Sequence, residues 1–459
     1  MSHAGEVGRA SARRRTLRAR KGGLKPALLF AFAVCTGVSA ADAPAPPGNV
    51  IDLPTALRLA GANNLDVQIA REKLAEAHAA SDSARAKFFP WIAPSIVVRR
   101  HENNIQAVNG PILDADKNSL AAGVALNAQF DLGETYYQNL VARQVVRANE
   151  AALASRQNET TYRVAVAYFD LARARASVGA AEEAARIGRR HADQIAVTAD
   201  AGLAFRGDAA RVRAASERSE LAVSRLHAEQ RIAAARLAEL LHLDPAVELT
   251  PAETDLAPLT LIAGTDDLAT LISHALAARP ELDEATARVT AARTARRGAT
   301  MAPLIPSVGA QASFGGLGGG PGSTAPGHDF DTSNDYAIGL SWRIGPGGLL
   351  DRNREREMAT RLRQSELDLE KTRDAIRRQV VEQHARLRSL SEQIELSRKA
   401  LEAADETARL SRARRETGVS AVLEDLQAED ELARARRDYL STVADYNQAQ
   451  YALRFATGG

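Results

Sequence analysis

Two acidic residues occupy matching places in the chain, and their setting suggests a specific electrostatic role. Asp208 follows Gly202 by six positions, and Glu424 follows Gly418 by the same interval. A glycine often ends a helix, and the helix dipole favours an acid in the first turn of the helix that comes next. The pattern therefore predicts two equivalent turns between helices, each with a carboxylate beside it.

No other group of residues indicates catalysis, a metal site or a cofactor. The nine histidines are scattered and include no His-Glu-x-x-His pattern. The Gly-rich segment 315–322 lacks the Lys-Ser/Thr pair that follows a phosphate-binding loop, so we expect an exposed hairpin loop there. The Arg-rich run 352–378 is interleaved with acids, which is typical of an ion-paired helix face and not of a nucleic-acid site. We therefore do not expect an enzyme.

The predicted turns must be held by very long helices. All seventeen prolines lie outside residues 112–244 and 347–459, and both segments are rich in good helix formers. We expect one long helix over about 134–201 and a second over about 349–417, each roughly 100 Å long at about 1.5 Å per residue. Apolar residues recur at heptad spacing in the second helix, with one four-residue step, which predicts a coiled coil with a local stutter.

Four shorter segments alternate apolar and polar residues and predict β-strands, over about 91–100, 119–131, 304–314 and 335–345. Their apolar face could pack on helices in a sandwich, or it could face lipid in a barrel wall. In the second case the lipid-facing residues include Val124, Leu126, Phe130, Phe314, Ile338, Leu340 and Trp342.

The order of these elements is written twice. Residues 50–244 form a first structural repeat and 267–459 a second, with a Pro-containing linker over 245–266. Each repeat is a helix, a strand pair, a long helix and a returning helix. The total of four strands is too few to close a barrel, and open edges in lipid are costly, so the barrel interpretation requires oligomerisation. Three copies would supply twelve strands.

The first forty residues predict an export signal, because a basic segment precedes the apolar run 27–38 and a Val-Ser-Ala site. Residues 41–49 would then be an N-terminal arm of the mature chain. Removing residues 1–40, which hold eight basic residues and one acid, would change the net charge from +2 to −5, which argues against a nucleic-acid partner. Cys35, the only cysteine, falls within this signal. Lipidation of Cys35 is the alternative, although Val34 before it is not the small residue that lipidation requires.

At this point the chain resembles the TolC-like family of outer-membrane efflux proteins over essentially all of residues 50–456. The resemblance is carried by the duplicated plan, by Pro90 and Pro303 where helix gives way to strand, and by the turns Ala201-Gly202-Leu203 and Thr417-Gly418-Val419-Ser420. It implies a homotrimer of mainly α class, with a twelve-stranded transmembrane β-barrel continuous with a coiled-coil α-helical tunnel through the periplasm. Such a duct sits in the outer membrane of a Gram-negative bacterium and works with a periplasmic adaptor and an inner-membrane pump.

The resemblance also implies roles for residues at the turns. Asp208, Glu424 and Asp425 would form the periplasmic constriction, where acids gathered on a three-fold axis favour cations. The sequence departs from the family at Gln427, where a second acidic ring would be, and at Ser420, where a basic partner for the other tip would be. The tips would contact the adaptor through Gly202, Leu203, Gly418, Val419 and Ser420.

Two functional hypotheses follow. The first is a passive exit duct of a tripartite efflux or type I secretion system, opened at its periplasmic tip. The second is a periplasmic coiled-coil scaffold without a pore, whose hairpins cap the rods. The apolar strand faces recur and are long enough to span lipid, which favours the duct hypothesis. The exported substrate and the class of pump cannot be read from the sequence.

Overall fold

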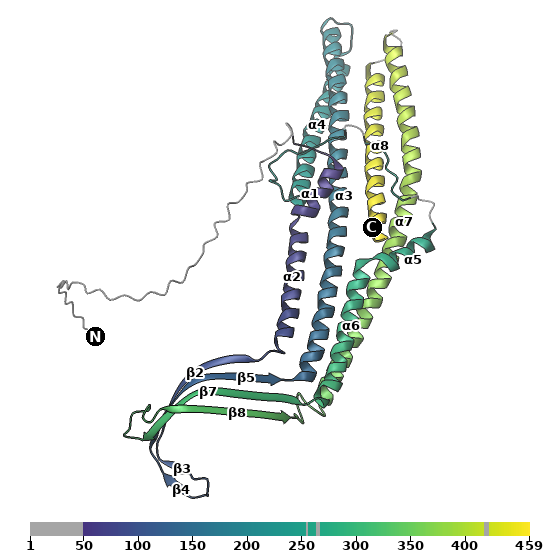
Figure 1. The fold of residues 1–459 in the computed structure, drawn as a ribbon. Helices are drawn as coiled ribbons and strands as arrows, with labels where there is room; N and C mark the ends of the chain where they lie inside the picture. Colours follow the sequence, from purple (N-terminus) through teal and green to yellow (C-terminus); the bar gives the residue numbers. More distant parts are fainter. Residues whose placement is uncertain (1–48, 254–255, 263–266, 417–421) are drawn as a thin grey trace, which may run out of the picture. The chain divides into compact units, whose positions relative to one another are not determined.

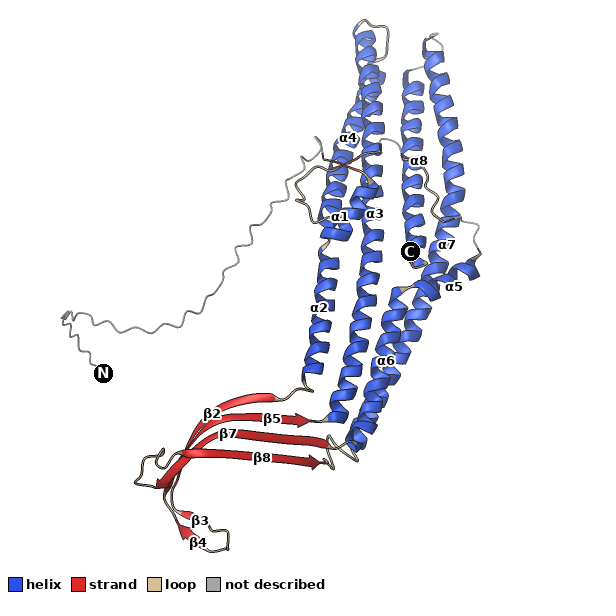
Figure 2. Cartoon of the chain, in the orientation of Figure 1, coloured by secondary structure: helices blue, strands red, loops and turns tan. Residues whose placement is uncertain are grey.

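The computed structural model describes residues 49–253, 256–262, 267–416 and 422–459 (Figure 1). The predicted export signal at 1–40, the arm up to residue 48, and the tip residues Gly418, Val419 and Ser420 lie outside these ranges. Helices make up most of the described chain, and the strands gather in one sheet with two small additions (Figure 2).

The described elements follow one order in both halves of the chain. The first half contains β1 (Val50–Ile51), α1 (Leu53–Asn63), α2 (Leu65–Ala86), β2 (Trp91–His101), β3 (Asn104–Gln106), β4 (Ile112–Asp114), β5 (Lys117–Phe130), α3 (Leu132–Asp200) and α4 (Arg206–Leu240). The second half contains β6 (Thr250–Pro251), α5 (Leu268–Ala278), α6 (Pro280–Met301), the short 3-10 helix η1 (Ala302–Leu304), β7 (Ser307–Pro321), β8 (Asp331–Ser341), α7 (Arg352–Glu416) and α8 (Val422–Ala456).

The sequence pattern predicted a single helix before each strand pair, but in both halves this helix is broken in two. In the first half Asn64 interrupts the helix, because its side-chain oxygen caps α2 and its Nδ2 donates to Leu240 O at 2.8 Å. In the second half Pro280 begins α6 after Arg279, whose backbone is extended. Both breaks therefore lie at a residue whose side chain or ring suits a helix start and not a helix interior.

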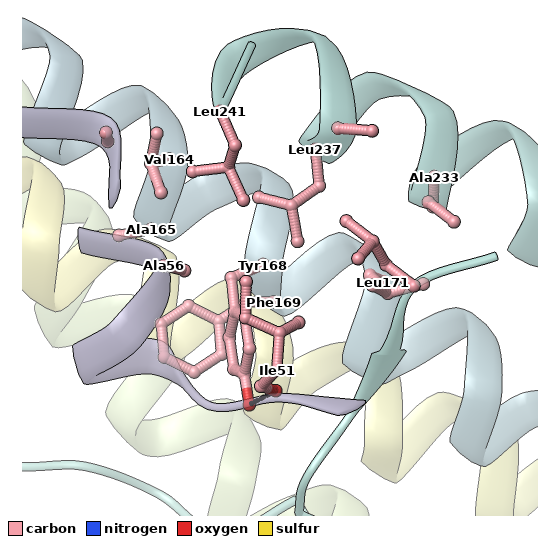
Figure 3. Close-up of a cluster of buried hydrophobic side chains, with 14 of the residues drawn as sticks. Ile51, Ala56, Val164, Ala165, Tyr168, Phe169, Leu171, Ala233, Leu237 and Leu241 are labelled. Atoms are coloured by element: carbon pink, nitrogen blue, oxygen red, sulfur yellow. Dashed lines mark hydrogen bonds between the residues drawn. The ribbon is translucent and has the colours of Figure 1, made fainter. Parts of the chain in front are cut away.

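The two long helices each pack along a shorter returning helix, α3 with α4 and α7 with α8. A core in the first half joins α1, α3 and α4, and it includes Tyr168, Leu171, Leu237 and Leu241 (Figure 3). The second half repeats this arrangement, because α5, α7 and α8 enclose a second core around Val380, Leu387 and Leu453. Helix α3 also contacts α6 and α8, so the two halves pack against each other.

The main sheet has the strand order β2-β5-β7-β8, and all its neighbours are antiparallel. β5 and β7 occupy the centre, which joins the strand pair of the first half to that of the second. The segment between β2 and β5, expected as a polar loop, contains the small antiparallel hairpin β3–β4. Strands β2 and β8 each have one edge without a strand partner among the described residues.

The expectation for the Gly-rich segment was wrong. β7 does not end near 314 but continues to Pro321, so the glycines from Gly315 to Gly320 lie in a central strand, and Gly322 lies in the turn that follows it. Close approach to β5 explains their use. A Cβ atom on Gly315 would lie 2.3 Å from Ala122 O, and one on Gly319 would lie 2.3 Å from Asn118 O. Only glycine fits at such contacts. Because glycine has a low strand propensity, the sequence alone does not indicate that these residues belong to a strand.

The last strand is also displaced from its expected range of 335–345. β8 begins at Asp331 and ends at Ser341, so Trp342 and Ile344 lie beyond it. The chain then turns at Gly345 and Gly347, which have positive φ angles of 111° and 74°. Asp351 begins α7 by accepting hydrogen bonds from the backbone N–H groups of Gly347 and Arg354, and these bonds lower its pKa. The glycine turn and the Asp351 cap therefore end the strand earlier than the alternation of apolar and polar residues predicted.

Within the described residues, no helix is both long enough and apolar enough to cross a membrane.

Candidate functional site

One face of the main sheet is apolar and exposed. The strand register places Leu126 beside Ile92 on one side and Ala312 on the other, and Val124 pairs with Phe314. Directly opposed residues in a sheet share a face. The exposed large residues on this face are Ile92, Ile96, Val98, Val124, Leu126, Phe314, Tyr336, Ile338 and Leu340. Ile338 is 83% exposed, so no described element covers the centre of β8 on this side.

The aromatic residues of this face lie on β5, β7 and β8, and one lies just beyond the end of β8. Phe314 and Tyr336 meet edge to face with ring centroids 5.6 Å apart. Phe130 lies opposite Val308, which in turn lies opposite Leu340. Trp342 stands past the end of β8, and its indole Nε1 donates to Leu304 O at 3.4 Å. Six of the seven residues expected to face lipid are thus on one sheet face. The seventh, Trp342, lies next to the sheet at the end where the strands meet the helices.

The opposite face of the sheet is small and polar. Its residues along β5 and β7 include Gly123, Asn127, Gln129, Gln311, Ser313 and Gly315. Its charged side chains are Lys117 on β5, Arg99 on the outer strand β2, and Asp331 and Asp335 on the outer strand β8. An apolar face and a polar face on strands of this length match the wall of a transmembrane barrel.

The turn between α3 and α4 is tight and carries exposed apolar side chains. Gly202 has a positive φ of 78°, and Leu203 N–H donates to Thr198 O at 2.9 Å, which closes the end of α3. Leu203 and Phe205 are 83% and 72% exposed. Asp208 follows in the first turn of α4 and forms an ion pair with Arg211 at 3.3 Å.

The two acids at the start of α8 have different surroundings. Glu424 is exposed and forms an ion pair with Arg414 of α7 at 3.0 Å. Asp425 is fully buried, and its Oδ2 lies 3.3 Å from Nε2 of His191 on α3. The three acids expected at the constriction therefore contact three different partners within the chain. Of these three acids, Asp208 and Glu424 have exposed carboxylates.

One turn further along α8, Glu429 is also buried and accepts a hydrogen bond from Arg412 of α7. This hydrogen bond raises the pKa of Arg412 above its usual value. His191, Arg412 and Glu429 were not identified from the sequence. The spacing of Asp425 and Glu429 places both acids on one helix face, and this was the available signal that the face packs against polar partners.

The described residues contain no group of three or more His, Cys, Asp or Glu side chains placed to hold a metal ion.

A two-faced sheet connected to two long helical hairpins defines the class of outer-membrane channels with a β-barrel and a helical tunnel. The sequence pattern of the family described as "Outer membrane efflux protein" matches residues 56–241 and 271–459, so the chain belongs to this family. The protein is therefore an outer-membrane efflux duct of the TolC-like type.

Individual proteins support the same assignment. Protein CyaE of Bordetella pertussis is 27% identical over 377 residues, which span 82% of this chain and 77% of that protein. The Campylobacter jejuni CmeC outer membrane channel has a TM-score of 0.76 at 15% identity, over 88% of this chain and 85% of the other. The open state of the Neisseria gonorrhoeae MtrE outer membrane channel has a TM-score of 0.74 at 19% identity, over 89% of each chain. These two structures are similar in fold.

Proposed function

We propose that the chain acts as a homotrimer, which forms a passive exit duct opened at its periplasmic tip. The observation that carries this proposal is the pair of unpartnered edges on β2 and β8, next to an exposed apolar face. Backbone groups without partners are costly in lipid, so the sheet must be closed by further strands. Three chains supply twelve strands, and antiparallel order is kept where β8 of one chain meets β2 of the next.

The tips would form the periplasmic end that opens. Glu424 and Asp208 are proposed as the acids of the constriction, since their carboxylates are exposed. Asp425 contributes to this end through its buried contact with His191, which fixes α8 against α3. The exposed apolar side chain of Leu203 supports its proposed contact with a periplasmic adaptor. Gly202, Gly418, Val419 and Ser420 complete the proposed adaptor-contact tips.

As a member of this family, the duct would receive cargo from an inner-membrane pump through that adaptor. CyaE and the channels CmeC and MtrE are proteins of several bacteria, and their likeness to this chain does not favour one cargo. The apolar sheet face argues against a scaffold without a pore, because a protein confined to the periplasm would expose that face to water.

Two neighbouring substitutions on β8 test the barrel. Ile338 lies on the apolar face and Ala337 on the polar face of the same strand. Ile338→Arg places a charge in lipid, which costs about 2–4 kcal/mol near the bilayer midplane, so we expect loss of the protein from the outer-membrane fraction. Ala337→Arg should be recovered there at the wild-type level, because its side chain faces water. Mass measurement of the detergent-extracted wild type should give three chains per particle.

Equal recovery of the Ile338→Arg and Ala337→Arg proteins would contradict the lipid-facing assignment. A particle of any mass other than three chains would contradict the trimer.

A further inference from the structure

The polar face of the sheet has an uneven distribution of charge between its two outer strands. β2 carries Arg99, and β8 carries Asp331 and Asp335. All three side chains are exposed, and within the described residues neither Arg99 nor Asp335 has an ion-pair partner. A positive charge on one free edge and negative charges on the other is the pattern expected of surfaces that meet each other.

The strand register determines that these side chains share a face. One row of directly opposed residues runs from Val97 through Ala121 and Leu317 to Asp331. Another row runs from Ala93 through Ala125 and Ser313 to Asp335. Arg99 is two residues from Val97 on β2 and therefore points to the same side of the sheet.

When copies of the sheet close into a barrel, a row of opposed residues that leaves one copy at β8 meets β2 of the next copy at a position displaced along the strand. Strands in such barrels tilt by about 35–45°, and with a spacing near 4.8 Å and a rise near 3.3 Å this displaces each row by about 4 to 6 residues per four strands. The displacement must be even, because an odd value would turn the apolar face of the next copy inward.

Only one direction of displacement keeps the edges paired. A shift toward the start of β2 would move most of β8 past Trp91, beyond the end of its partner strand. A shift toward His101 lets β8 pair with β2 along most of its length. A displacement of about four residues then places Arg99 opposite Ser333, between the two aspartates, and one of about six places it opposite Asp335.

We propose that Arg99 of one copy forms an ion pair with Asp335, or with both Asp331 and Asp335, of the next copy across each β8–β2 seam. This inference rests on the proposed trimer and adds residues that limit its register. A slip of two residues would keep the apolar face outside, so hydrophobicity alone does not prevent it. A larger slip that carries Arg99 beyond both aspartates would leave it without an acidic partner, so the ion pair restricts the seam to registers near the two displacements given above.

Disulfide trapping tests the seam directly. Cys35 is the only cysteine, so a Cys35→Ser background removes the native thiol. In that background, Arg99→Cys is combined with either Ser333→Cys or Asp335→Cys, and the full-length protein is extracted in detergent. Directly opposed residues have Cα separations of about 4.5–5.5 Å, which a disulfide spans. We expect one of the two combinations to give covalently linked chains on a non-reducing gel.

The matched control is Ala93→Cys with Asp335→Cys, two residues that lie in one row if the sheet closes without displacement. It should give no linked chains. Particle mass is measured for every variant. A trimeric mass with no linked chains from either Arg99 combination would overturn the seam inference alone, whereas a wild-type mass other than three chains would overturn the proposed trimer.

Charge reversal provides a second readout that does not depend on cysteine chemistry. Arg99→Glu should reduce the yield of trimer, and adding Asp335→Lys should restore it. Arg100→Glu is the control, because Arg100 points to the other face and pairs with Glu102 of its own chain. Failure of the double variant to recover, together with absence of linked chains, would leave no support for the pair.

Discussion

Arg279 is expected to be a large single contributor to the stability of the helical part. Its guanidinium is buried, with 6% of the side chain exposed, and it contacts the three helices α6, α7 and α8. It donates to both carboxylate oxygens of Glu281 at 2.9 Å, to Gln379 Oε1 at 3.1 Å, and to the carbonyls of Phe455 and Ala456 at 3.1 and 3.2 Å. The ring of Phe455 lies 4.7 Å below the guanidinium carbon.

The substitution Arg279→Met keeps much of the side-chain volume but removes every hydrogen bond. Removing one partner of a buried ion pair costs about 3–5 kcal/mol. Because Glu281 is 24% exposed and retains its hydrogen bond from Ser155, we assign the lower end of this energy range to the loss of the Arg279–Glu281 pair. The carbonyls of Phe455 and Ala456 each lose the donor that Arg279 supplied, although Phe455 O keeps its hydrogen bond from Gly458 N–H. We therefore expect a loss of about 3–4 kcal/mol.

The measurement is urea unfolding of the detergent-extracted protein, followed by far-ultraviolet circular dichroism. Arg373→Met is the matched control, because Arg373 pairs only with Glu370 of its own helix at 2.6 Å and is 41% exposed. This control should lie within about 0.5 kcal/mol of the wild type. Equal stabilities of the two variants would refute the reasoning, since burial and hydrogen-bond number would then not determine the effect.

Two further predictions concern ionisable groups. Burial raises the pKa of Glu281, but hydrogen bonds from Arg279 and other groups outweigh it and hold the pKa below the ordinary value of 4.5. The ionised carboxylate therefore stabilises the fold above about pH 4.5, and this stability is lost as the pH falls through the lowered pKa. We expect Glu281→Gln to weaken acid-induced loss of stability in urea unfolding at several pH values, and an unchanged acid response would contradict this. Glu424→Ala should lower cation preference or alter single-channel conductance in planar bilayers, whereas the same pore properties in variant and wild type would remove Glu424 from the constriction.

Much of the helical fold could be predicted from the sequence because its main signals are local. The long helices α3 and α7 follow from proline-free segments of good helix formers. The break at Asn64 was missed because helical periodicity continues on both sides of it. Its cause is partly non-local, since the asparagine side chain also binds Leu240 at the end of α4. A sequence pattern shows which face is apolar but not which distant backbone group requires a donor.

The site was predictable to a smaller degree. Alternation placed Val124, Leu126 and Ile338 on one face, and the observed register agrees with that placement. The contact between Asp425 and His191 was not predictable, because it joins helices from different halves of the chain. Resemblance assigned Asp425 to the constriction with Glu424, although only packing shows that one carboxylate is buried and the other exposed.

The glycines of β5 and β7 have a consequence for how the duct can change in evolution. Gly123, Gly315 and Gly319 lie on the polar face, where the wall consists of bare backbone. A substitution can add atoms at these positions but cannot remove any, and each added Cβ would collide with the neighbouring strand. Substitutions at these glycines therefore cannot widen the passage. Adaptation to bulkier cargo must instead act on residues of the same face that possess side chains, such as Leu317 and Gln311.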